Sequence, residues 1–424
     1  MRQSPLQVEL RRVVIVGAGD CGTRVALNLR ERGFLGDITL VGEEPDAPYE
    51  RPELSKSVLT SDGATPKAIT SEVQLGELGI TWLPNVRAVA IDSQNQTVAL
   101  ADARSLEYDR LLVATGARAR RPPMPGADIA RSLRSLSDAV ALRGHLRAGA
   151  RLLVIGGGFI GLEAAATALE RGCQVTVVEF AERLMSRVVP NMIAEHIHSR
   201  HIAAGCDLRL GVGVEHLKQV EDHTVATLSD GSRSSFDIVI AGIGAIPNTE
   251  LAATARLSIA NGIAVDGQLR TSDPAIYAAG DCCSIPHPIY DGARLRVEAW
   301  QSAITQADVA AENILGGSRT FDSIPWFWSD QYDLHLQIAG LHSFASREVV
   351  RRRADGAELL FGLDAAGRVV SASGVAQGLS VSRDISVASS LIAARTIVQP
   401  SDLSDPSLDL RSLARGRRGE PVRS

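Results

Sequence analysis

The apolar positions near the N-terminus predict a strand–helix–strand unit. An apolar strand at Arg12–Val16 runs into the glycine-rich turn Gly17–Gly22, and an Ala-containing helix follows until Gly33. A second apolar strand at Ile38–Val41 stops at Glu43 and a further glutamate. A short apolar strand, a glycine turn and an amphipathic helix in this order are typical of a βαβ unit with parallel strands.

The same pattern recurs farther along the chain. Leu152–Ile155 forms an apolar strand, Gly156–Gly161 repeats the G-x-G-x-x-G spacing, and an Ala-rich helix leads to a strand at Gln174–Val178 that ends at Glu179. A third apolar strand is predicted within Leu111–Gly116, where it ends in a small-residue turn. The chain therefore contains two similar units with a strand between them.

The remaining pattern predicts additional strands. Asp237–Ala241 is apolar and precedes the loop Gly242–Asn248, and Thr271–Asp281 combines a turn with a short apolar run. From about Phe321 the composition shifts, and strand-like alternation appears near Glu348–Phe361. A chain of 424 residues exceeds the usual size of one compact core, so two or three domains are expected.

The chemistry of the glycine turn explains why this spacing matters. Gly17 allows the tight turn, Gly19 lets the backbone approach a pyrophosphate, and Gly22 lets helix and strand pack closely. The helix N-terminus then binds phosphate through its free N–H groups and its dipole. An acidic residue about twenty positions on binds a ribose hydroxyl, and Glu43 and Glu179 stand in that position. Tight turns without a ligand are the alternative, but two complete motifs indicate two dinucleotide sites.

Composition and charge exclude several classes of function. Hydrophobic residues make up 45% and charged residues 22% of the chain, and the formal net charge is −5. Neither value favours nucleic-acid binding. No apolar run reaches the length of a membrane span, and the N-terminus lacks the apolar segment of a signal peptide. A cytoplasmic protein without a membrane partner is expected.

The chain has five cysteines, at positions 21, 173, 206, 282 and 283. An odd number without C-x-x-C spacing argues against a disulfide framework and against a redox dithiol. Cys282 and Cys283 are adjacent and could form a strained vicinal disulfide. Two small residues packed under a loop are the favoured interpretation.

The order of these motifs resembles that of flavoprotein oxidoreductases with two dinucleotide sites. Three further segments, Pro48–Lys56, Arg296–Trp300 and Pro325–Asp330, resemble the NADH-dependent ferredoxin reductases that serve bacterial oxygenases. The resemblance implies bound FAD, which accepts hydride from NADH and passes single electrons to a 2Fe–2S ferredoxin. It leaves open whether the protein is a monomer or a homodimer.

The resemblance also implies the domain order. An α/β fold is expected, with two nested Rossmann-like domains and a C-terminal α+β domain. The expected FAD-binding domain covers residues 8–118 and 247–320, interrupted by an NAD-binding domain at 119–246. The C-terminal domain is expected at 321–410 and a disordered Arg-rich tail at 411–424. Thr271–Asp281 must then return to the first sheet, so that Asp281 lies beside the ribityl chain of FAD.

By resemblance, the stretch Pro48–Leu59 corresponds to the one that carries a cysteine pair over the flavin in disulfide reductases, but it has no cysteine and contains Lys56. By resemblance, Lys56 lies at the flavin ring and pairs with Glu163, which follows Gly161 by two positions. An ammonium group there would stabilise negative charge on the reduced ring. An exposed surface pair is the alternative. Glu53 departs from the usual pattern and places a second carboxylate near Lys56 in sequence.

The other implied contacts concern the two cofactors. Trp300 and Trp328 are expected at the flavin, and Phe159 is expected to cover the nicotinamide pocket, although packing within the protein is the alternative for all three. Glu179 favours NADH because it would repel a 2′-phosphate, while the nearby Arg183 could contact the adenosine half. The complete set of expected cofactor-binding residues is Gly17, Gly19, Asp20, Cys21, Gly22, Glu43, Glu44, Arg51, Lys56, Val89, Ala114, Thr115, Gly116, Arg120, Gly156, Gly157, Gly158, Phe159, Ile160, Gly161, Glu163, Glu179, Arg183, Gly242, Ile243, Gly244, Gly280, Asp281, Ala299, Trp300 and Trp328.

A metal site is the less favoured interpretation of Glu195, His196, His198 and His201, because only three of these residues fall on one helix face. Two other functions remain as alternatives to ferredoxin reduction. One is an NADH oxidase or a reductase of quinones or other small acceptors. The other is an NADH-sensing flavoprotein of the apoptosis-inducing-factor type.

Overall fold

The computed structural model describes residues 10–378 and 381–415. The chain forms two compact units. The first unit comprises residues 1–50, 67–118 and 246–323, and the second comprises residues 51–66, 119–245 and 324–424. The first unit resembles the expected interrupted FAD-binding domain without residues 51–66. The second unit contains these residues, and it joins the expected NAD-binding and C-terminal domains in one compact unit.

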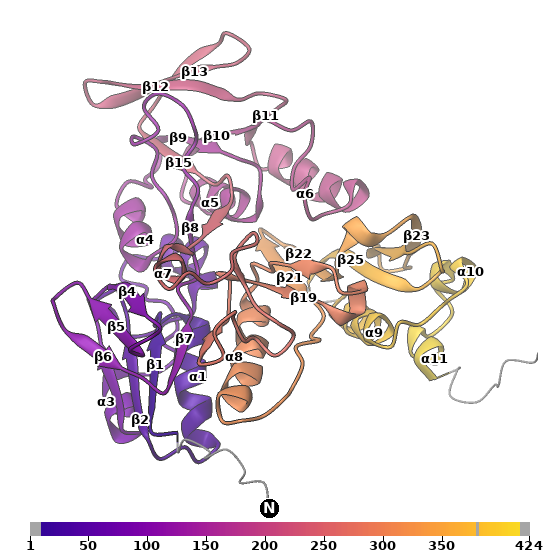
Figure 1. Cartoon of the computed structure of the whole chain (residues 1–424). Coiled ribbons are helices and arrows are strands. Elements are labelled where there is room, and N and C mark those ends of the chain that lie inside the picture. The colour runs from indigo at the N-terminus through magenta and orange to yellow at the C-terminus, as the bar shows by residue number, and fades with distance from the viewer. Residues whose placement is uncertain (1–9, 379–380, 416–424) are drawn as a thin grey trace, which may run out of the picture. The chain divides into compact units, whose positions relative to one another are not determined.

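A five-stranded parallel sheet forms the centre of the first unit (Figure 1). Its strands in spatial order are β18 (Ile276–Ala278), β7 (Arg110–Val113), β1 (Arg12–Val16), β2 (Asp37–Val41) and β3 (Ile80–Leu83). Strand β1 is central, and Val13 and Ile15 are almost completely buried. Strand β18 pairs in parallel with β7, which confirms that residues 271–281 return to the first sheet.

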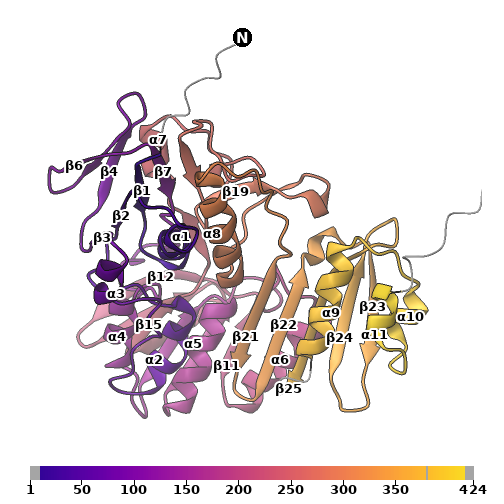
Figure 2. The ribbon, with the colours of Figure 1, turned by 90° about the horizontal axis from the view of Figure 1, so that it is seen from below.

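Helices α1 (Asp20–Glu31) and α8 (Trp300–Ile314) pack against each other in this unit (Figure 2). The apolar side of α1, with Val25, Ala26 and Leu29, is buried in the core that includes the strands. The smaller elements of the unit are α3 (Glu72–Glu77), β4 (Ala88–Asp92), β5 (Thr97–Leu100), β6 (Ser105–Glu107), α7 (Glu250–Thr254), β17 (Ile263–Ala264), β19 (Cys283–Pro286), η2 (Pro288–Tyr290) and β20 (Arg294–Leu295). Strands β8 (Ala117–Ala119) and β16 (Ala245–Pro247) lie where the chain passes between the units.

A second parallel sheet organises the middle of the chain. Its strands in spatial order are β11 (Asp207–Leu210), β10 (Gln174–Glu179), β9 (Arg151–Ile155) and β15 (Ile238–Ala241). Helix α5 (Phe159–Glu170) packs on β9 and β10, and α6 (Asn191–Ala203) packs on β11. An antiparallel sheet of β12 (Val214–Val220), β13 (His223–Leu228) and β14 (Arg233–Phe236), together with α4 (Leu136–Arg143), completes this part. Both predicted βαβ units are thus confirmed.

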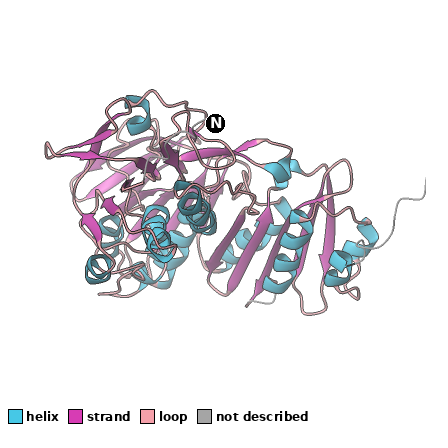
Figure 3. Ribbon diagram, turned by 60° about the horizontal axis from the view of Figure 1, so that its bottom comes forward, coloured by secondary structure: helices cyan, strands magenta, loops and turns pink. Residues whose placement is uncertain are grey.

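The C-terminal part of the second unit is an antiparallel sheet covered by helices (Figure 3). Its strands in spatial order are β21 (Trp326–Gln331), β22 (Leu334–Gly340), β25 (Val369–Gln377), β24 (Glu358–Leu363) and β23 (Arg347–Arg352). Helix α9 (Ser382–Ala393) packs on β22 and β25. The remaining elements are η3 (His342–Phe344), α10 (Pro400–Ser404) and α11 (Leu410–Arg415). The predicted α+β character is confirmed.

Two arginines hold the short segment 51–66, which contains η1 (Arg51–Ser55) and α2 (Ser57–Thr60). Arg143 Nη1 donates to the carbonyls of Val58, Ser61 and a third residue of the segment. Arg171 Nη1 donates to the carbonyl of Thr60 at 2.8 Å. These charge-assisted bonds explain why the segment groups with the second unit.

Helix α11 corrects one expectation about the C-terminus. Residues 411–415 continue this helix, so the disorder predicted for them is wrong. Leu410 is buried and gives the helix an apolar anchor. Residues 416–424 of the predicted tail lie outside the described residues. Within the described ranges, no helix has the length and apolarity needed to cross a membrane.

Candidate functional site

The first glycine turn is closed by contacts that only glycine permits. Gly17 has φ +115°, and a Cβ on it would lie 2.1 Å from the carbonyl oxygen of Ala114. A Cβ on Gly22 would lie 1.9 Å from the carbonyl oxygen of Gly17. The turn is therefore tight, as the sequence predicts, and it directs the chain from β1 into α1.

The start of α1 has the features of a phosphate-binding helix end. Gly19 is the N-cap residue, so no cap side chain competes for the free N–H groups of the first turn. The N-terminus of α8 lies beside it, because Trp300 Nε1 donates to Asp20 Oδ1 at 3.1 Å. Two positive helix ends thus meet at one edge of the sheet. This arrangement fits the pyrophosphate of a dinucleotide.

The other predicted small-residue segments meet at the same edge. The parallel strands β1, β7 and β18 place the Gly17 turn, Ala114–Gly116 and Gly280–Asp281 at their carboxyl ends. Thr115 and Asn248 form a reciprocal pair, in which Thr115 Oγ1 donates to Asn248 O and Asn248 Nδ2 donates to Thr115 O, each at 2.8 Å. The residues expected to hold FAD in this unit are thus brought together around the sheet edge.

The two adjacent glutamates after β2 differ in their surroundings. Glu43 is exposed, and so it is available to a ribose. Glu44 accepts a hydrogen bond from the Tyr49 hydroxyl at 2.5 Å. Val89, expected near the adenine, is also exposed, with 45% of its surface accessible.

The second glycine turn repeats the geometry of the first. Gly156 has φ +105°, and a Cβ on it would lie 2.7 Å from the carbonyl oxygen of Gly242. A Cβ on Gly161 would lie 2.3 Å from the carbonyl oxygen of Gly156. In contrast, the nearest atom to a Cβ on Gly158, the N-cap of α5, is 3.7 Å away. The turn is closed toward the protein and open at the cap, which fits a second dinucleotide.

Glu179 is fixed at the end of β10 by the backbone. Its Oε2 accepts a hydrogen bond from Gly157 N at 2.7 Å, and its Oε1 accepts one from Ala181 N at 2.8 Å. A carboxylate has about four acceptor positions, so both oxygens can still accept from a ribose. The carboxylate predicted to select NADH therefore faces the glycine turn.

The remaining residues expected to contact the nicotinamide nucleotide differ in their exposure and in their hydrogen bonds. Phe159 is partly exposed at the first position of α5, so it is not a buried core aromatic, and Ile160 is exposed. Arg183 donates to the carbonyls of Val189 and Ser186 at 2.7 and 2.8 Å, which ties its guanidinium to its own loop. Gly244 accepts a hydrogen bond from the backbone of Arg120, whose side chain is exposed.

Lys56 lies in an ionic cluster of the second unit, and its nearest carboxylate is Asp330. The distance from Lys56 Nζ to Asp330 Oδ2 is 2.9 Å, and the distance to Glu163 Oε1 is 4.0 Å. Asp330 Oδ1 also accepts a hydrogen bond from His335 Nδ1 at 2.7 Å. The predicted Lys56–Glu163 pair exists, but Lys56 is shared between two carboxylates. Glu53, the second carboxylate near Lys56 in sequence, accepts a hydrogen bond from the hydroxyl of Ser57.

Glu163 is the buried member of this cluster, with 6% of its surface exposed. Its two oxygens accept hydrogen bonds from the hydroxyls of Ser55 and Ser329, at 2.5 and 2.6 Å. Burial raises the pKa of Glu163, and Lys56 and the two serines only partly oppose this shift. For Asp330, burial works to raise the pKa, but Lys56 and His335 outweigh it and hold the pKa below its usual range.

The tryptophans after the domain boundary flank the cluster. Trp326 and Trp328 stack with ring centroids 5.2 Å apart, and Lys56 Nζ lies 5.4 Å from the centroid of the Trp328 ring. Both rings are partly exposed. Arg51, at the start of the same segment, donates to the carbonyl of Arg134 at 2.6 Å.

Sequence reasoning missed Asp330, His335 and the two serines. Ser55, Ser329 and Asp330 stand inside the segments that carry the family resemblance, Pro48–Lys56 and Pro325–Asp330. That position was the available signal. His335 has no comparable signal, because only the pairing of β21 with β22 brings it opposite Asp330.

All five cysteines are buried and free of disulfides. Cys282 Sγ lies 3.4 Å from Val113 O, and Cys283 Sγ lies 3.2 Å from Gln306 Oε1. Burial raises the pKa of Cys282 to about 11 and that of Cys206 to about 12. Packing of Cys282 and Cys283 as small residues is thus confirmed, and these thiols are protonated at neutral pH.

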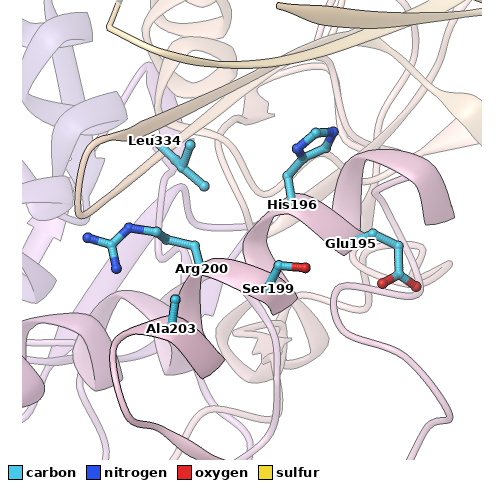
Figure 4. Close-up of a pocket in the computed structure, with 6 residues that line it drawn as sticks. All are labelled: Glu195, His196, Ser199, Arg200, Ala203 and Leu334. Carbon is cyan, nitrogen blue, oxygen red and sulfur yellow. The ribbon is translucent and has the colours of Figure 1, made fainter. Parts of the chain in front are cut away.

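The histidines of α6 have separate partners. His196 Nε2 lies 2.9 Å from Glu358 Oε2, while His201 is buried between Gln331 and Tyr332. Groups of three possible metal ligands are not found among the described residues. A cavity of about 390 Å³ is lined by α6 and by Leu334 (Figure 4). It contains neither glycine turn.

Two comparisons of sequence identify the family. Residues 11–307 match the family described as pyridine nucleotide-disulphide oxidoreductase, and residues 326–414 match a reductase C-terminal domain. The ferredoxin–NAD(+) reductase component of the anthranilate 1,2-dioxygenase system of Burkholderia cepacia is 38% identical, over 94% of this chain and 98% of the relative. Rhodocoxin reductase of Rhodococcus erythropolis is also 38% identical, over 94% of this chain and 93% of the relative.

A solved structure agrees with the sequence comparisons. Putidaredoxin reductase, in its covalent complex with putidaredoxin, is 36% identical and superposes with a TM-score of 0.90. The match covers 97% of this chain and 99% of that chain. This chain therefore belongs to the pyridine nucleotide-disulphide oxidoreductase family, in which its relatives include ferredoxin–NAD(+) reductase components of oxygenase systems.

Proposed function

We propose that this protein is an FAD-dependent NADH:ferredoxin oxidoreductase whose 2Fe–2S ferredoxin feeds an oxygenase. The observation that carries the proposal is the presence of a complete dinucleotide-binding turn in each compact unit. One turn holds a resident cofactor and the other holds the nucleotide that exchanges electrons with it.

The first unit provides the site for FAD. The backbone of Gly17–Gly22 and the N-terminus of α1 bind the pyrophosphate, while Glu43 binds the ribose of the adenosine half. Asp281 follows β18 at the same sheet edge. Its carboxylate accepts hydrogen bonds from hydroxyl groups of the ribityl chain. FAD, when bound, supplies the chemistry of accepting a hydride and releasing electrons singly.

The second unit provides the site for NADH. Gly156–Gly161 and the N-terminus of α5 bind the pyrophosphate, and Glu179 accepts the 2′-hydroxyl of the adenosine ribose. Since both oxygens of Glu179 are held by backbone N–H groups, its charge stays at this position. A 2′-phosphate would meet this charge and be repelled, so NADH is preferred to NADPH.

Lys56 is proposed to act on the charge of the flavin. It is held between Asp330 and Glu163, and an ammonium group in a partly buried setting stabilises a nearby anion. Thiol chemistry is not part of the proposal, because all five cysteines are buried. The protein therefore lacks an accessible dithiol of the kind through which a disulfide reductase passes electrons on.

The relatives that are named as ferredoxin reductases support the choice of a ferredoxin as acceptor, because they match this chain over nearly its full length. Steady-state reduction of cytochrome c by the purified holoprotein tests this choice. We expect slow reduction with NADH alone and a large acceleration when a 2Fe–2S ferredoxin is added. Equal rates with and without ferredoxin, together with rapid consumption of oxygen or quinone, would favour a small-acceptor reductase.

A further inference from the structure

Phe180 is the first residue after strand β10, and its side chain is 81% exposed. An aromatic ring is among the largest apolar surfaces that a side chain can present to water. Its neighbour Glu179 ends β10 and faces the second glycine turn through Gly157. Phe180 is therefore the next residue in the chain after the carboxylate that is proposed to bind the adenosine ribose.

The backbone around Phe180 is held on both sides. Glu179 Oε1 accepts a hydrogen bond from Ala181 N at 2.8 Å, which closes a short turn around Phe180. The loop after β11 runs alongside, because Gly211 N donates to Ala181 O at 3.1 Å and Val212 N donates to Glu179 O at 3.0 Å. The backbone at Phe180 is thus fixed by hydrogen bonds and does not depend on burial of the ring.

One side of the ring rests on Gly213. A Cβ on Gly213 would lie 3.3 Å from Cδ2 of Phe180 and 4.0 Å from Cε2. The glycine therefore lets the ring approach the backbone, which is itself fixed by a hydrogen bond from Gly213 N to Ser229 Oγ at 2.9 Å. The rest of the ring remains open to solvent.

We propose that Phe180 stacks on the adenine ring of NADH and contributes to its affinity. The inference rests on the proposed function, since it requires Glu179 to bind the 2′-hydroxyl of the adenosine ribose. Adenine is attached to the carbon next to the one that carries this hydroxyl. The base must therefore lie close to the residue that follows Glu179, and a base offers a π face to an aromatic side chain.

Exposure alone does not carry this inference. Leu35 is even more exposed, at 95%, and lies outside both glycine turns. Single exposed apolar side chains of this kind are normal on protein surfaces. Phe180 differs because its ring lies against Gly213 and because it directly follows, in the chain, the carboxylate held at the second glycine turn. Leu35 is therefore the matched control.

The test is calorimetric titration of the holoprotein with ADP-ribose, which has the adenosine half of the nucleotide but no nicotinamide. We expect Phe180→Ala to weaken ADP-ribose binding by about tenfold or more, the effect of losing one stacked base. Phe180→Trp should retain the affinity, and Leu35→Ala should match the parent. All variants should melt at the parent temperature, because the side chains replaced are exposed.

Reduction of the bound flavin by two different donors provides a second readout. Phe180→Ala should raise the NADH concentration needed for half-maximal reduction and leave the limiting rate unchanged. With reduced nicotinamide mononucleotide, which has no adenine, the parent and Phe180→Ala should behave alike.

Three results would overturn the inference. One is an affinity of Phe180→Ala for ADP-ribose that lies within about twofold of the affinity of the parent. Another is equal impairment with both donors. A third is normal ADP-ribose binding combined with loss of ferredoxin reduction, which would place Phe180 at the partner protein. If the parent itself neither binds ADP-ribose nor is reduced by NADH, the proposed function fails as well, and this outcome is distinct from the others.

Discussion

Three carboxylates of the second unit differ in the groups that donate hydrogen bonds to their oxygens or pair with their charge. Glu179 accepts hydrogen bonds from two backbone N–H groups, and Glu163 accepts them from two buried serine hydroxyls. Asp330 lies between Lys56 and His335. Their surroundings therefore suit them to different tasks: selecting a nucleotide, taking up a proton more readily, and compensating a positive charge.

The first residue-scale prediction concerns Glu179 and the choice of nucleotide. NADH should be preferred to NADPH by at least about tenfold in kcat/KM, or roughly 1.4 kcal/mol, because the fixed carboxylate repels a 2′-phosphate. Glu179→Ala should narrow this ratio. Glu182→Ala is the control and should leave the ratio unchanged, since the Glu182 carboxylate lies by Gly211. Equal kcat/KM for the two nucleotides in the parent would contradict the assignment.

The second residue-scale prediction concerns the effect of Lys56 on the midpoint potential of the flavin. Lys56→Met should lower the potential, since the reduced flavin loses a stabilising cation, and about 30 mV corresponds to 1.4 kcal/mol for a two-electron couple. Asp330→Asn and Glu163→Gln should each raise it, because they remove compensating negative charge. A spectroscopic redox titration measures these shifts.

Lys67 supplies the control for this titration. It is an exposed lysine in the first unit that pairs with Glu50, so Lys67→Met should leave the potential unchanged. If Lys56→Met and Asp330→Asn also stay at the parent value, the cluster is structural and has no electrostatic role toward the flavin.

The third concerns Glu163 and the dependence of stability on pH. Burial raises the pKa of Glu163 in the folded protein above the value of about 4.3 in an unfolded chain. The folded state then holds more protons between these two values, so its stability falls as pH rises through that window. Glu163→Gln removes this dependence. The free energy of unfolding of the variant, relative to the parent, should therefore increase as pH rises above about 4.3, and a constant difference would contradict the raised pKa.

At the scale of elements, the two strand–turn–helix units could be predicted because each depends on local chemistry. Only glycine can adopt the backbone of Gly17 and Gly156 and avoid the carbonyls that face them. The apolar runs before and after each turn then fix the parallel strands. The return of β18 to the first sheet was implied by the family resemblance.

Contacts between distant segments could not be predicted in this way. Lys56 and Asp330 are 274 positions apart, and their contact depends on where segment 51–66 and strand β21 pack in the second unit. The clamps from Arg143 and Arg171 that hold this segment have no sequence signature. Likewise, α11 forms where an Arg-rich composition indicated disorder, because Leu410 has an apolar core to enter.

The element-scale prediction compares two glycines that both have positive φ. Gly17→Ala should lose FAD and unfold more readily, because its Cβ would collide with the carbonyl of Ala114. Gly33→Ala has no atom within 4 Å of its Cβ, so it should keep FAD and lose only about 1 kcal/mol of stability from backbone strain. Flavin absorbance per mole of protein and thermal melting measure both effects. Equal flavin content in the two variants would contradict the assignment of the first turn.

At the scale of the whole molecule, each compact unit carries one complete glycine turn and its own acidic residue. The chain crosses between the units near residues 51, 67, 118 and 245 and again near 323. A single chain thus supplies one site for a resident flavin and one for an exchanging nucleotide. This organisation is what the proposed electron transfer from NADH to a ferredoxin requires.

The most direct test of this account follows both half-reactions without oxygen. One equivalent of NADH added to the FAD-loaded protein should bleach the flavin absorbance, and oxidised 2Fe–2S ferredoxin added next should restore it. Because a hydride delivers two electrons and each 2Fe–2S cluster accepts one, two ferredoxins should be reduced for every NADH consumed. A flavin that NADH does not bleach, or one that NADH reduces but ferredoxin fails to reoxidise, would contradict the account.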